Sequence, residues 1–320
     1  MTDYSVLFPM APVRPEHLLP FAALVQWTAA RRLWQGQTVA VDPFQTTAGV
    51  AAAGFRVPAG VGVTLMPLRN PVEVAVQART LAGVTGHPFV LGIGPGSVSL
   101  QRALLPEPYA RPLAAAREYL TIVRALLDGR SPDVTGEYFR CEAELPMWPS
   151  PEVEVGLGVL RPGAARLAGE VADRAVTWLT PASYVRDTLV PALREGAERA
   201  GRPVPRITCM VPLALAGDDR DPVRLALASN AAHLSAPHYV DMLARAGVHV
   251  DAGRPAAAAE ALVKGKGFLH GDLDELADDL AAYEEAGVDE VVLNTLGVLR
   301  THGVDVAVNE LETVIERMVR

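Results

Sequence analysis

The sequence predicts an α/β protein whose strands and helices form a (β/α)8 TIM barrel. Short apolar segments bounded by glycine or proline alternate along the chain with longer amphipathic segments, which is typical of strands and helices around a parallel sheet. Nearly all of the short segments are apolar on both faces, as expected of strands that are buried on both sides. No linker interrupts the 320 residues. We therefore expect one barrel domain over residues 1–320, with insertions after some strands, in preference to a doubly wound sheet with a second domain.

The apolar segments place eight strands along the chain. They are expected at Ser5–Pro9, Arg32–Gln35, Val61–Met66, Phe89–Ile93, Val153–Leu157, Ala175–Leu179, Ile207–Leu215 and Val291–Leu296. Two connections are too long to be simple turns, the proline-rich segment Arg130–Pro151 and the alanine-rich segment Ala216–Asp272. Because loops that follow barrel strands gather at the carboxyl end of the barrel, we expect these two segments to determine which substrate binds.

The helices between the strands repeat their apolar residues at helical spacing, as in the segment Leu113–Gly129. The helix before the last strand has the best-defined ends. Asp272 can cap its start together with Glu275, and Gly287 can adopt the left-handed conformation that ends it. Its apolar face consists of Leu273, Leu276, Leu280 and Tyr283.

Composition and charge exclude several classes of function. The chain has 29 Lys and Arg against 37 Asp and Glu, a formal net charge of −8, so nonspecific binding to nucleic acid is not expected. Cys141 and Cys209 have no partner at disulfide or zinc spacing and are expected to be buried thiols, with no metal site. The segment Met1–Pro12 lacks a basic targeting region, and no stretch approaches the roughly 18 apolar residues of a membrane span. We expect a cytoplasmic protein with no membrane or nucleic-acid partner.

The segment Phe89–Ser97, FVLGIGPGS, joins a strand to three closely spaced glycines. A dinucleotide-binding fingerprint would need a helix directly after the glycines and an acidic residue about 20 positions later. Pro95 interrupts the turn, and the segment at that distance is helical, so this interpretation fails. Two alternatives stay open: a strand end that passes close to a flat ligand, or glycines needed only for a tight turn.

The segment Val153–Pro181 is expected to form a strand, a glycine-rich turn, a helix and a second strand. Pro162 suits the first position of the helix, which leaves the amide groups of residues 163–165 free at the positive end of the helix dipole, with Arg161 beside them. This arrangement predicts a phosphate site. The alternative is a solvated helix end with Arg161 on the surface.

No other catalytic motif is present. The seven histidines show no metal-ligand spacing, and His233 and His238 do not share a helical face. The chain has neither the G-x-S-x-G turn of serine hydrolases nor the G-x-x-x-x-G-K-[ST] loop of nucleoside-triphosphate enzymes.

Taken together, the segments resemble the bacterial luciferase-like family of flavin- and deazaflavin-dependent oxidoreductases. The resemblance covers most of the chain and rests on GVGVTLMPLRNP at 60–71, AVQARTL at 75–81, LGIGPG at 91–96, the helix at 113–129 with GEYF at 136–139, and ARLAGEVADRAVTWLTP at 165–181. The fragment RLWQGQ at 32–37 resembles the branch that uses coenzyme F420, a deazaflavin.

The resemblance implies a cofactor that lies across the carboxyl mouth of the barrel. Gly62 and Val63 would back its ring, at a bulge where F420 members have a nonprolyl cis peptide. The other implied contacts are Gly94, Gly96 and Ser97 at the border of the ring or the substrate, Leu160, Arg161, Gly163 and Ala164 at the phosphate, and Trp178, Leu179 and Thr180 on the far side. A homodimer is expected, with close helix packing over Thr46–Gly54 and Val72–Gly83.

The chain departs from the family pattern at the end of the second strand. Many F420 members have an Asp-His pair there for proton transfer, whereas this chain has Gly36 and Gln37. No catalytic acid or base is identified, and the proton donor would have to be Tyr109, His87 or a bound water.

Three functions stay open. The first is hydride transfer between F420 and a small-molecule substrate or biosynthetic intermediate, in which the protein supplies orientation and a dry pocket. The second is an FMN-dependent monooxygenase, since FMN reacts with oxygen. The third is a noncatalytic barrel that binds a cofactor or metabolite.

Overall fold

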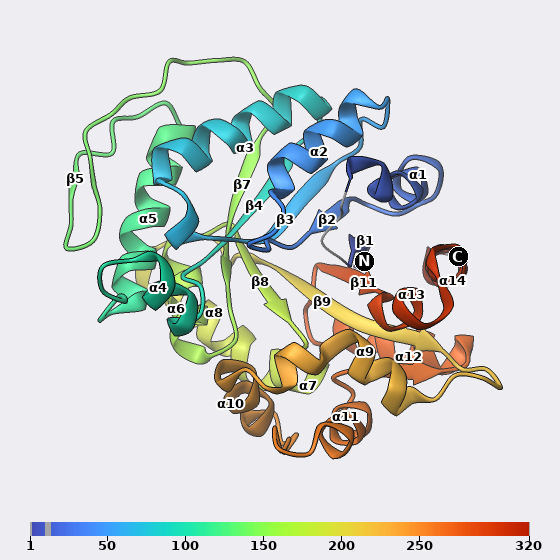
Figure 1. Ribbon diagram of the computed structural model, residues 1–320. Helices are drawn as coiled ribbons and strands as arrows, with labels where there is room; N and C mark the ends of the chain where they lie inside the picture. The colour runs from blue at the N-terminus through green and yellow to red at the C-terminus, as the bar shows by residue number, and fades with distance from the viewer. Residues whose placement is uncertain (1, 10–13, 320) are drawn as a thin grey trace.

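Eight parallel strands close into a barrel in the computed structural model, which describes residues 2–9 and 14–319 (Figure 1). The barrel strands are β1 (Asp3–Phe8), β2 (Leu33–Gln35), β3 (Ala59–Leu65), β4 (Phe89–Gly94), β7 (Val153–Gly158), β8 (Arg174–Trp178), β9 (Arg206–Leu215) and β11 (Glu290–Asn294). They pair in chain order, and the circle closes because β8 pairs with β9, β9 with β11 and β11 with β1. The predicted (β/α)8 barrel and its eight strands are therefore confirmed.

Three short strands lie outside the prediction. The strand β10 (Leu269–Gly271) pairs with the carboxyl end of β9, and β5 (Val134–Thr135) forms an antiparallel hairpin with β6 (Arg140–Cys141). All three lie in the two long segments that the sequence marks as insertions.

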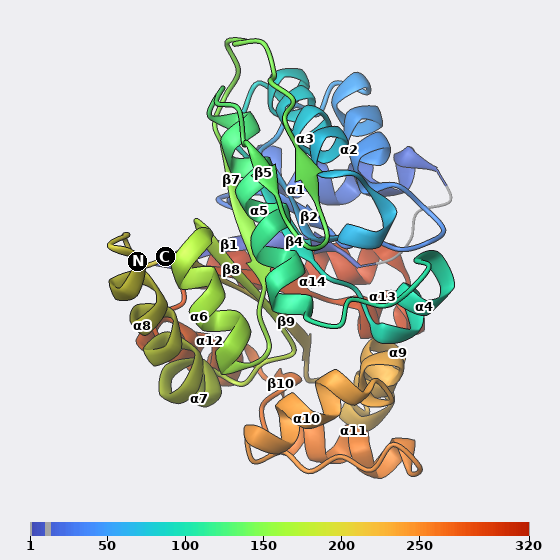
Figure 2. The same ribbon diagram turned by 90° about the vertical axis from the view of Figure 1, so that its left-hand side faces the viewer.

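Helices surround the barrel and connect its strands. They are η1 (Pro15–Leu18), α1 (Leu19–Trp27), α2 (Pro43–Ala52), η2 (Met66–Leu68), α3 (Pro71–Thr85), α4 (Val98–Leu104), α5 (Pro112–Leu127), α6 (Pro162–Val171), α7 (Ala182–Tyr184), η3 (Val185–Leu189), α8 (Val190–Ala200), α9 (Pro222–Leu234), α10 (Pro237–Arg245), α11 (Pro255–Lys264), α12 (Leu273–Glu285), α13 (Leu296–His302) and α14 (Val304–Val319). Figure 2 shows α9, α10 and α11, in orange, together at one end of the molecule. The long segment between β9 and β11 thus builds a helical layer of its own.

The helix α12 has the ends that the sequence predicts. The carboxylate of Asp272 accepts from the backbone N–H of Glu275, and the Glu275 side chain accepts in return from the N–H of Asp272, each at 2.9 Å. Gly287 follows the helix with φ of +85°. The capping box and the glycine stop are confirmed.

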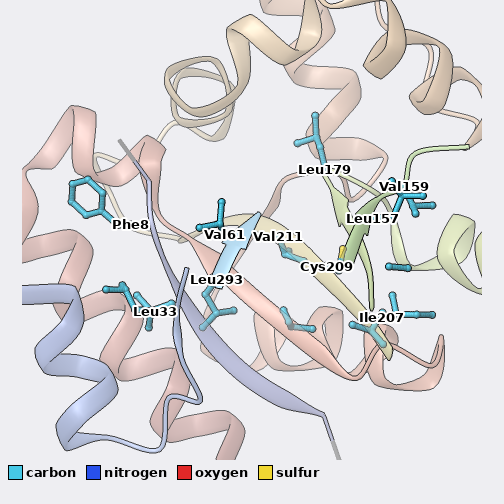
Figure 3. Packing of buried hydrophobic residues seen from close by; sticks show 14 of the residues in the cluster. Phe8, Leu33, Val61, Leu157, Val159, Leu179, Ile207, Cys209, Val211 and Leu293 are labelled. Carbon is cyan, nitrogen blue, oxygen red and sulfur yellow. The ribbon is translucent and has the colours of Figure 1, made fainter. Parts of the chain in front are cut away.

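Apolar side chains form two separate layers of core. The larger layer lies between the strands and the helices, where Figure 3 shows Val61, Leu157 and Leu293 among others. The smaller layer fills the barrel itself and consists of Leu7, Trp34, Val90, Val176, Met210 and Val292. Both cysteines are free and buried, as expected.

Trp34 fills the barrel interior because β3 carries glycine beside it. A Cβ atom at Gly60 would lie 2.9 Å from the indole ring, which is closer than carbon atoms approach. The indole is fully buried, and its N–H donates to Glu290 at 2.7 Å. A large ring therefore replaces several smaller side chains at the centre of the barrel.

A buried carboxylate, that of Glu290, organises the amino end of the barrel. Its Oε1 accepts from Ser5 at 2.6 Å, from Trp34, and from Arg32 Nε at 2.9 Å, while its Oε2 accepts from Arg174 Nη1 at 2.7 Å. The two guanidinium groups and the carboxylate are each at most 2% exposed. Burial raises the pKa of Glu290, but the positive charges of Arg32 and Arg174 outweigh it, so the pKa lies below its ordinary value.

Among the described residues, no helix is long and apolar enough to cross a membrane, and no group of three or more potential ligands could hold a metal ion. Residues 10–12 of the segment Met1–Pro12, and Met1 itself, lie outside the described residues. The single domain over residues 1–320, the cytoplasmic location and the dimer stay predictions.

We predict that Glu290→Gln destabilises the protein by about 3–5 kcal/mol, because it removes the carboxylate that pairs with the buried Arg32 and one of the two carboxylates that pair with the buried Arg174, which keeps its ion pair with Glu154. Urea unfolding monitored by tryptophan fluorescence measures the change. The exposed Glu107→Gln is the control and is expected to change stability by less than about 0.5 kcal/mol.

The same variant should change the response to acid. Since the folded protein lowers the pKa of Glu290, its contribution is present above the ordinary carboxyl value of 4.5 and is lost as pH falls through the folded value. The wild type should lose stability more steeply than the variant below that pH. Equal slopes would contradict the role given to Glu290.

Candidate functional site at the mouth of the barrel

A cavity of about 790 Å³ opens at the carboxyl ends of β3, β4, β7 and β8. The starts of α4, α5 and α6 and the helix α10 complete its wall. Carboxyl ends of barrel strands are where TIM barrels carry their active sites. The position alone makes this cavity the candidate functional site.

The floor of the cavity is a bulge in β3. The peptide bond between Gly62 and Val63 is cis, and the register between β3 and β4 shifts between Val61 and Thr64. Both features agree with the expectation drawn from the resemblance. A Cβ atom at Gly94 would lie 2.8 Å from Cγ2 of Val63, so glycine at this position lets Val63 lie low over β4. The result is a flat, apolar floor.

The loop after β4 is held in place by side chains that point back to it. Gln101 donates to the carbonyls of Pro95 and Gly96, at 3.0 and 3.1 Å, and accepts from the N–H of Tyr109 at 3.0 Å. Ser97 caps α4 by accepting from the N–H of Leu100 at 3.2 Å. This wall of the cavity is therefore built from fixed backbone.

The start of α6 carries the positive charge of the cavity. Pro162 occupies the first helical turn, and no side chain caps the helix at Arg161. Arg161 pairs with Asp241 of α10 at 2.6 Å, and Asp241 also pairs with Arg245 at 2.9 Å. Both arginines line the cavity. Two guanidinium groups and the positive end of a helix face one carboxylate, which leaves a net attraction for an anion.

Four aromatic rings form a continuous wall beside this charge. His233 stacks on Trp178, with 5.4 Å between the ring centroids. The rings of His233 and Tyr239 are T-shaped to each other, with 4.8 Å between their centroids. His238 lies 4.7 Å from Tyr239. Burial lowers the pKa of His233 to about 4, with a smaller contribution from His238. Burial and then Arg161 lower the pKa of His238, so both imidazoles are neutral at pH 7.

The sequence of the chain matches a known protein family over most of its length. The family model of luciferase-like monooxygenases covers residues 7–290. The chain belongs to this family. Membership also explains the barrel and the site at its carboxyl mouth, and it makes the chain one of a family of oxidoreductase enzymes.

Relatives within the luciferase-like family include F420-dependent enzymes. The F420-dependent glucose-6-phosphate dehydrogenase of Nakamurella multipartita is 33% identical over 180 residues, which cover 54% of this chain and only about half, 52%, of that relative. The enzyme of the same name from Nocardia farcinica is 26% identical over 258 residues, or 78% of this chain and 76% of the relative.

Solved structures of other oxidoreductases share the fold. An F420-dependent secondary alcohol dehydrogenase in complex with an F420-acetone adduct superposes with a TM-score of 0.78 at 18% identity, covering 99% of each chain. A type II Baeyer-Villiger monooxygenase from Pseudomonas putida in complex with FMN superposes with a TM-score of 0.70 at 16% identity, covering 99% of this chain and 98% of the other. At these identities the likeness shows the fold alone.

Ten of the twelve residues expected at the cofactor line the cavity together. They are Gly62, Val63, Gly94, Gly96, Ser97, Leu160, Arg161, Gly163, Ala164 and Trp178. Leu179 and Thr180 do not line it. The chain turns at Leu179 with φ of +60°, which buries both side chains in the core, where the backbone carbonyl of Thr180 accepts from Tyr283 of α12 at 3.2 Å.

Gln37, a neutral side chain, stands where the resemblance implies the proton-transfer pair of many F420 members. Gln37 accepts from Arg69 Nη1 at 2.7 Å and donates to the carbonyl of Thr38 at 2.6 Å. It lines a separate cavity of about 260 Å³ together with Arg69 and Asp42, which pair at 2.8 Å. Gln37 is therefore part of a polar cluster beside the main cavity.

Two suggested proton donors also lie elsewhere. His87 precedes β4 and so lies at the amino end of the barrel, where its Nε2 is 3.1 Å from the carbonyl of Arg56. Tyr109 packs edge-on against Tyr138, and its pKa is raised by burial. Neither lines the main cavity.

Sequence reasoning missed the contribution of α9 and α10. On one continuous helix, His233 and His238 would not share a face. In the structure α9 ends before Pro237 and α10 begins there, so the two histidines lie on different helices and both contact Tyr239. The only signal in the sequence was the length of the segment Ala216–Asp272.

We predict that His238 titrates below its ordinary value of 6.5 and that Arg161→Gln raises its pKa, because the variant removes a positive charge that disfavours the imidazolium. Burial still acts in the variant, so the pKa should not pass 6.5. NMR titration of labelled histidine measures it. Arg166→Gln, on the same helix but paired with Glu195, should leave the value unchanged. A wild-type value of 6.5 or above would contradict the burial of this ring.

Proposed function

We propose that this luciferase-like protein is an F420-dependent oxidoreductase that transfers a hydride between F420 and a small organic substrate. One observation carries the proposal: the flat floor at Gly62 and Val63 and the positive start of α6 belong to a single cavity. A flat tricyclic ring with a phosphate on its side chain needs this combination. The named activities of the relatives in Nakamurella multipartita and Nocardia farcinica support the choice of F420.

The residues of the cavity fit such a group at both ends. Gly62, Val63 and Gly94 leave a flat surface on which a ring can lie. The amide groups of Gly163 and Ala164 and the guanidinium groups of Arg161 and Arg245 would hold the phosphate. Trp178 would close the side wall, with Leu179 and Thr180 behind it, and Ser97 would border the ring or the substrate.

F420 supplies hydride transfer without oxygen activation, because a carbon replaces the ring nitrogen N5 of a flavin. The protein's own part is orientation and exclusion of water. No carboxylate is found among the described residues that line the cavity, and His238 is neutral at pH 7. The rate should therefore change little between pH 7 and 9, with a proton exchanged through water or substrate.

An FMN-dependent monooxygenase is the second candidate. FMN has a ring of the same outline and a phosphate, so the same residues would hold it, and the FMN-bound monooxygenase of Pseudomonas putida shares the fold. A barrel that binds a cofactor without turnover is the third.

Binding and turnover separate these functions. We predict that the purified protein binds F420 and not FMN, and that it passes a hydride between F420 and an organic substrate without consuming oxygen. Fluorescence titration with each cofactor and an oxygen electrode measure this. Tight FMN binding with oxygen consumption, and no affinity for F420, would overturn the proposal in favour of the monooxygenase.

We also predict that Arg161→Glu weakens F420 binding at least tenfold, because it removes one guanidinium group from the phosphate and adds a repelling charge. The dissociation constant is measured in low salt. Arg166→Glu provides the control, since Arg166 shares α6 but does not line the cavity. An unchanged dissociation constant for F420 in Arg161→Glu would contradict binding of the phosphate at the start of α6.

A further inference from the structure

The permanent charge of the main cavity is confined to one end. Among the described residues that line it, Arg161 and Arg245 are the only Lys, Arg, Asp or Glu side chains. Both pair with Asp241, so this end carries a net charge of about one unit plus the positive end of α6. That charge suits a single anionic group.

The other end, formed by β3 and the loop after β4, is apolar. Leu65, Pro95 and Val98 line it. The polar side chains there are engaged with the protein: the amide nitrogen of Gln101 donates to a backbone carbonyl, its amide oxygen accepts from a backbone N–H, and Ser97 caps α4. Gln101 is only 3% exposed, so its hydrogen bonds do not exchange readily for a ligand.

Arg69, whose guanidinium group lies near this end, has its positive charge balanced by an ion pair. The short helix η2 packs on Gly96 through Pro67, and Arg69 follows it directly. Arg69 is 7% exposed, pairs with Asp42 at 2.8 Å, and donates to Gln37 and Thr64 as well. Its charge is therefore balanced inside the protein.

We propose that the substrate site is this apolar end and that it accepts a neutral, mostly apolar carbonyl or hydroxyl compound while rejecting anions such as sugar phosphates. The inference rests on the proposed function, in which the cofactor phosphate occupies the arginine end. An anionic group at the apolar end would lose its hydration without gaining a cationic partner. A substrate with a phosphate, such as the glucose-6-phosphate named for two relatives, meets no second cationic site here.

The redox step balances without another reactant. An alcohol substrate loses a hydride from its carbon to oxidised F420 and its hydroxyl proton to water, and leaves as the carbonyl compound. The reverse reaction takes one hydride from reduced F420 and one proton from water.

A pair of probes that differ only in charge tests the substrate class. Cyclohexanecarboxamide and cyclohexanecarboxylate have the same shape, and calorimetry gives their dissociation constants for protein saturated with F420. We expect the amide to bind at least tenfold more tightly, and glucose-6-phosphate to bind no better than the carboxylate. Equal or tighter binding of either anion, or no binding of the amide, would overturn the inference.

The affinity for F420 alone is measured first, so the two proposals fail separately. Absence of F420 binding would sink the proposed function. Normal F420 binding with a preference for anions would sink the substrate class only.

A charge-introducing variant locates the site. Val98→Arg places a cation on the apolar end, and it should strengthen carboxylate binding at least tenfold. Leu104→Arg is the matched control, because Leu104 is on the same helix and similarly exposed, 45% against 55%, but does not line the cavity. An unchanged carboxylate affinity in Val98→Arg would mean that the substrate does not lie at this end.

Discussion

The carboxylate of Glu290 ties four barrel strands together at their amino ends. It belongs to β11, and its partners come from β1, from β8, and from β2 with the residue before it. A charge without water is tolerated only when every acceptor site is satisfied, and here two arginines, an indole and a hydroxyl share the task. Since one of these donors is Trp34, the network also orients the ring that fills the barrel. The floor of the cavity lies directly over this packed interior.

The site follows from how the barrel is filled. Trp34 and Met210 occupy the centre, so β3 needs glycine at position 60 beside Trp34 and at position 62 beside Met210. The bulge at Gly62 and Val63 then turns a strand end into a flat surface. Glycine at position 94 of the neighbouring strand β4 leaves room for the side chain of Val63. The packing below the cavity therefore determines the shape of its floor, because a large aromatic ring on β2 requires glycine on the neighbouring strand β3.

Apolar runs and terminal patterns were enough to predict the eight strands and the capping box of α12, because burial on both faces and cap chemistry are local properties. The floor at Gly62 and Val63 was predicted from the resemblance. The positive end of the cavity was predicted from the resemblance and from Pro162, which begins a helix beside Arg161. The Glu290 network could not be predicted in this way, since Arg174 and Glu290 stand at strand starts, where charged residues usually contact water. Leu179 and Thr180 do not line the cavity, because the left-handed backbone at Leu179 turns both side chains into the core. The aromatic wall could not be predicted because it depends on contacts between Trp178 of β8 and residues of α9 and α10, which are far from Trp178 in the sequence.

The ion pair between Arg161 and Asp241 has a consequence for how an anion enters. Asp241 already pairs with both arginines, so the phosphate proposed for this end would have to exchange with a resident carboxylate. The amide groups at the start of α6 have no such occupant among the side chains, since none caps that helix. Selection among anions would then depend on reaching the helix end and the arginines together, which the oxygens of a tetrahedral phosphate group would do better than those of a planar carboxylate. Because Asp241 lies on α10, the same exchange would link occupancy of the cavity to the position of that helix.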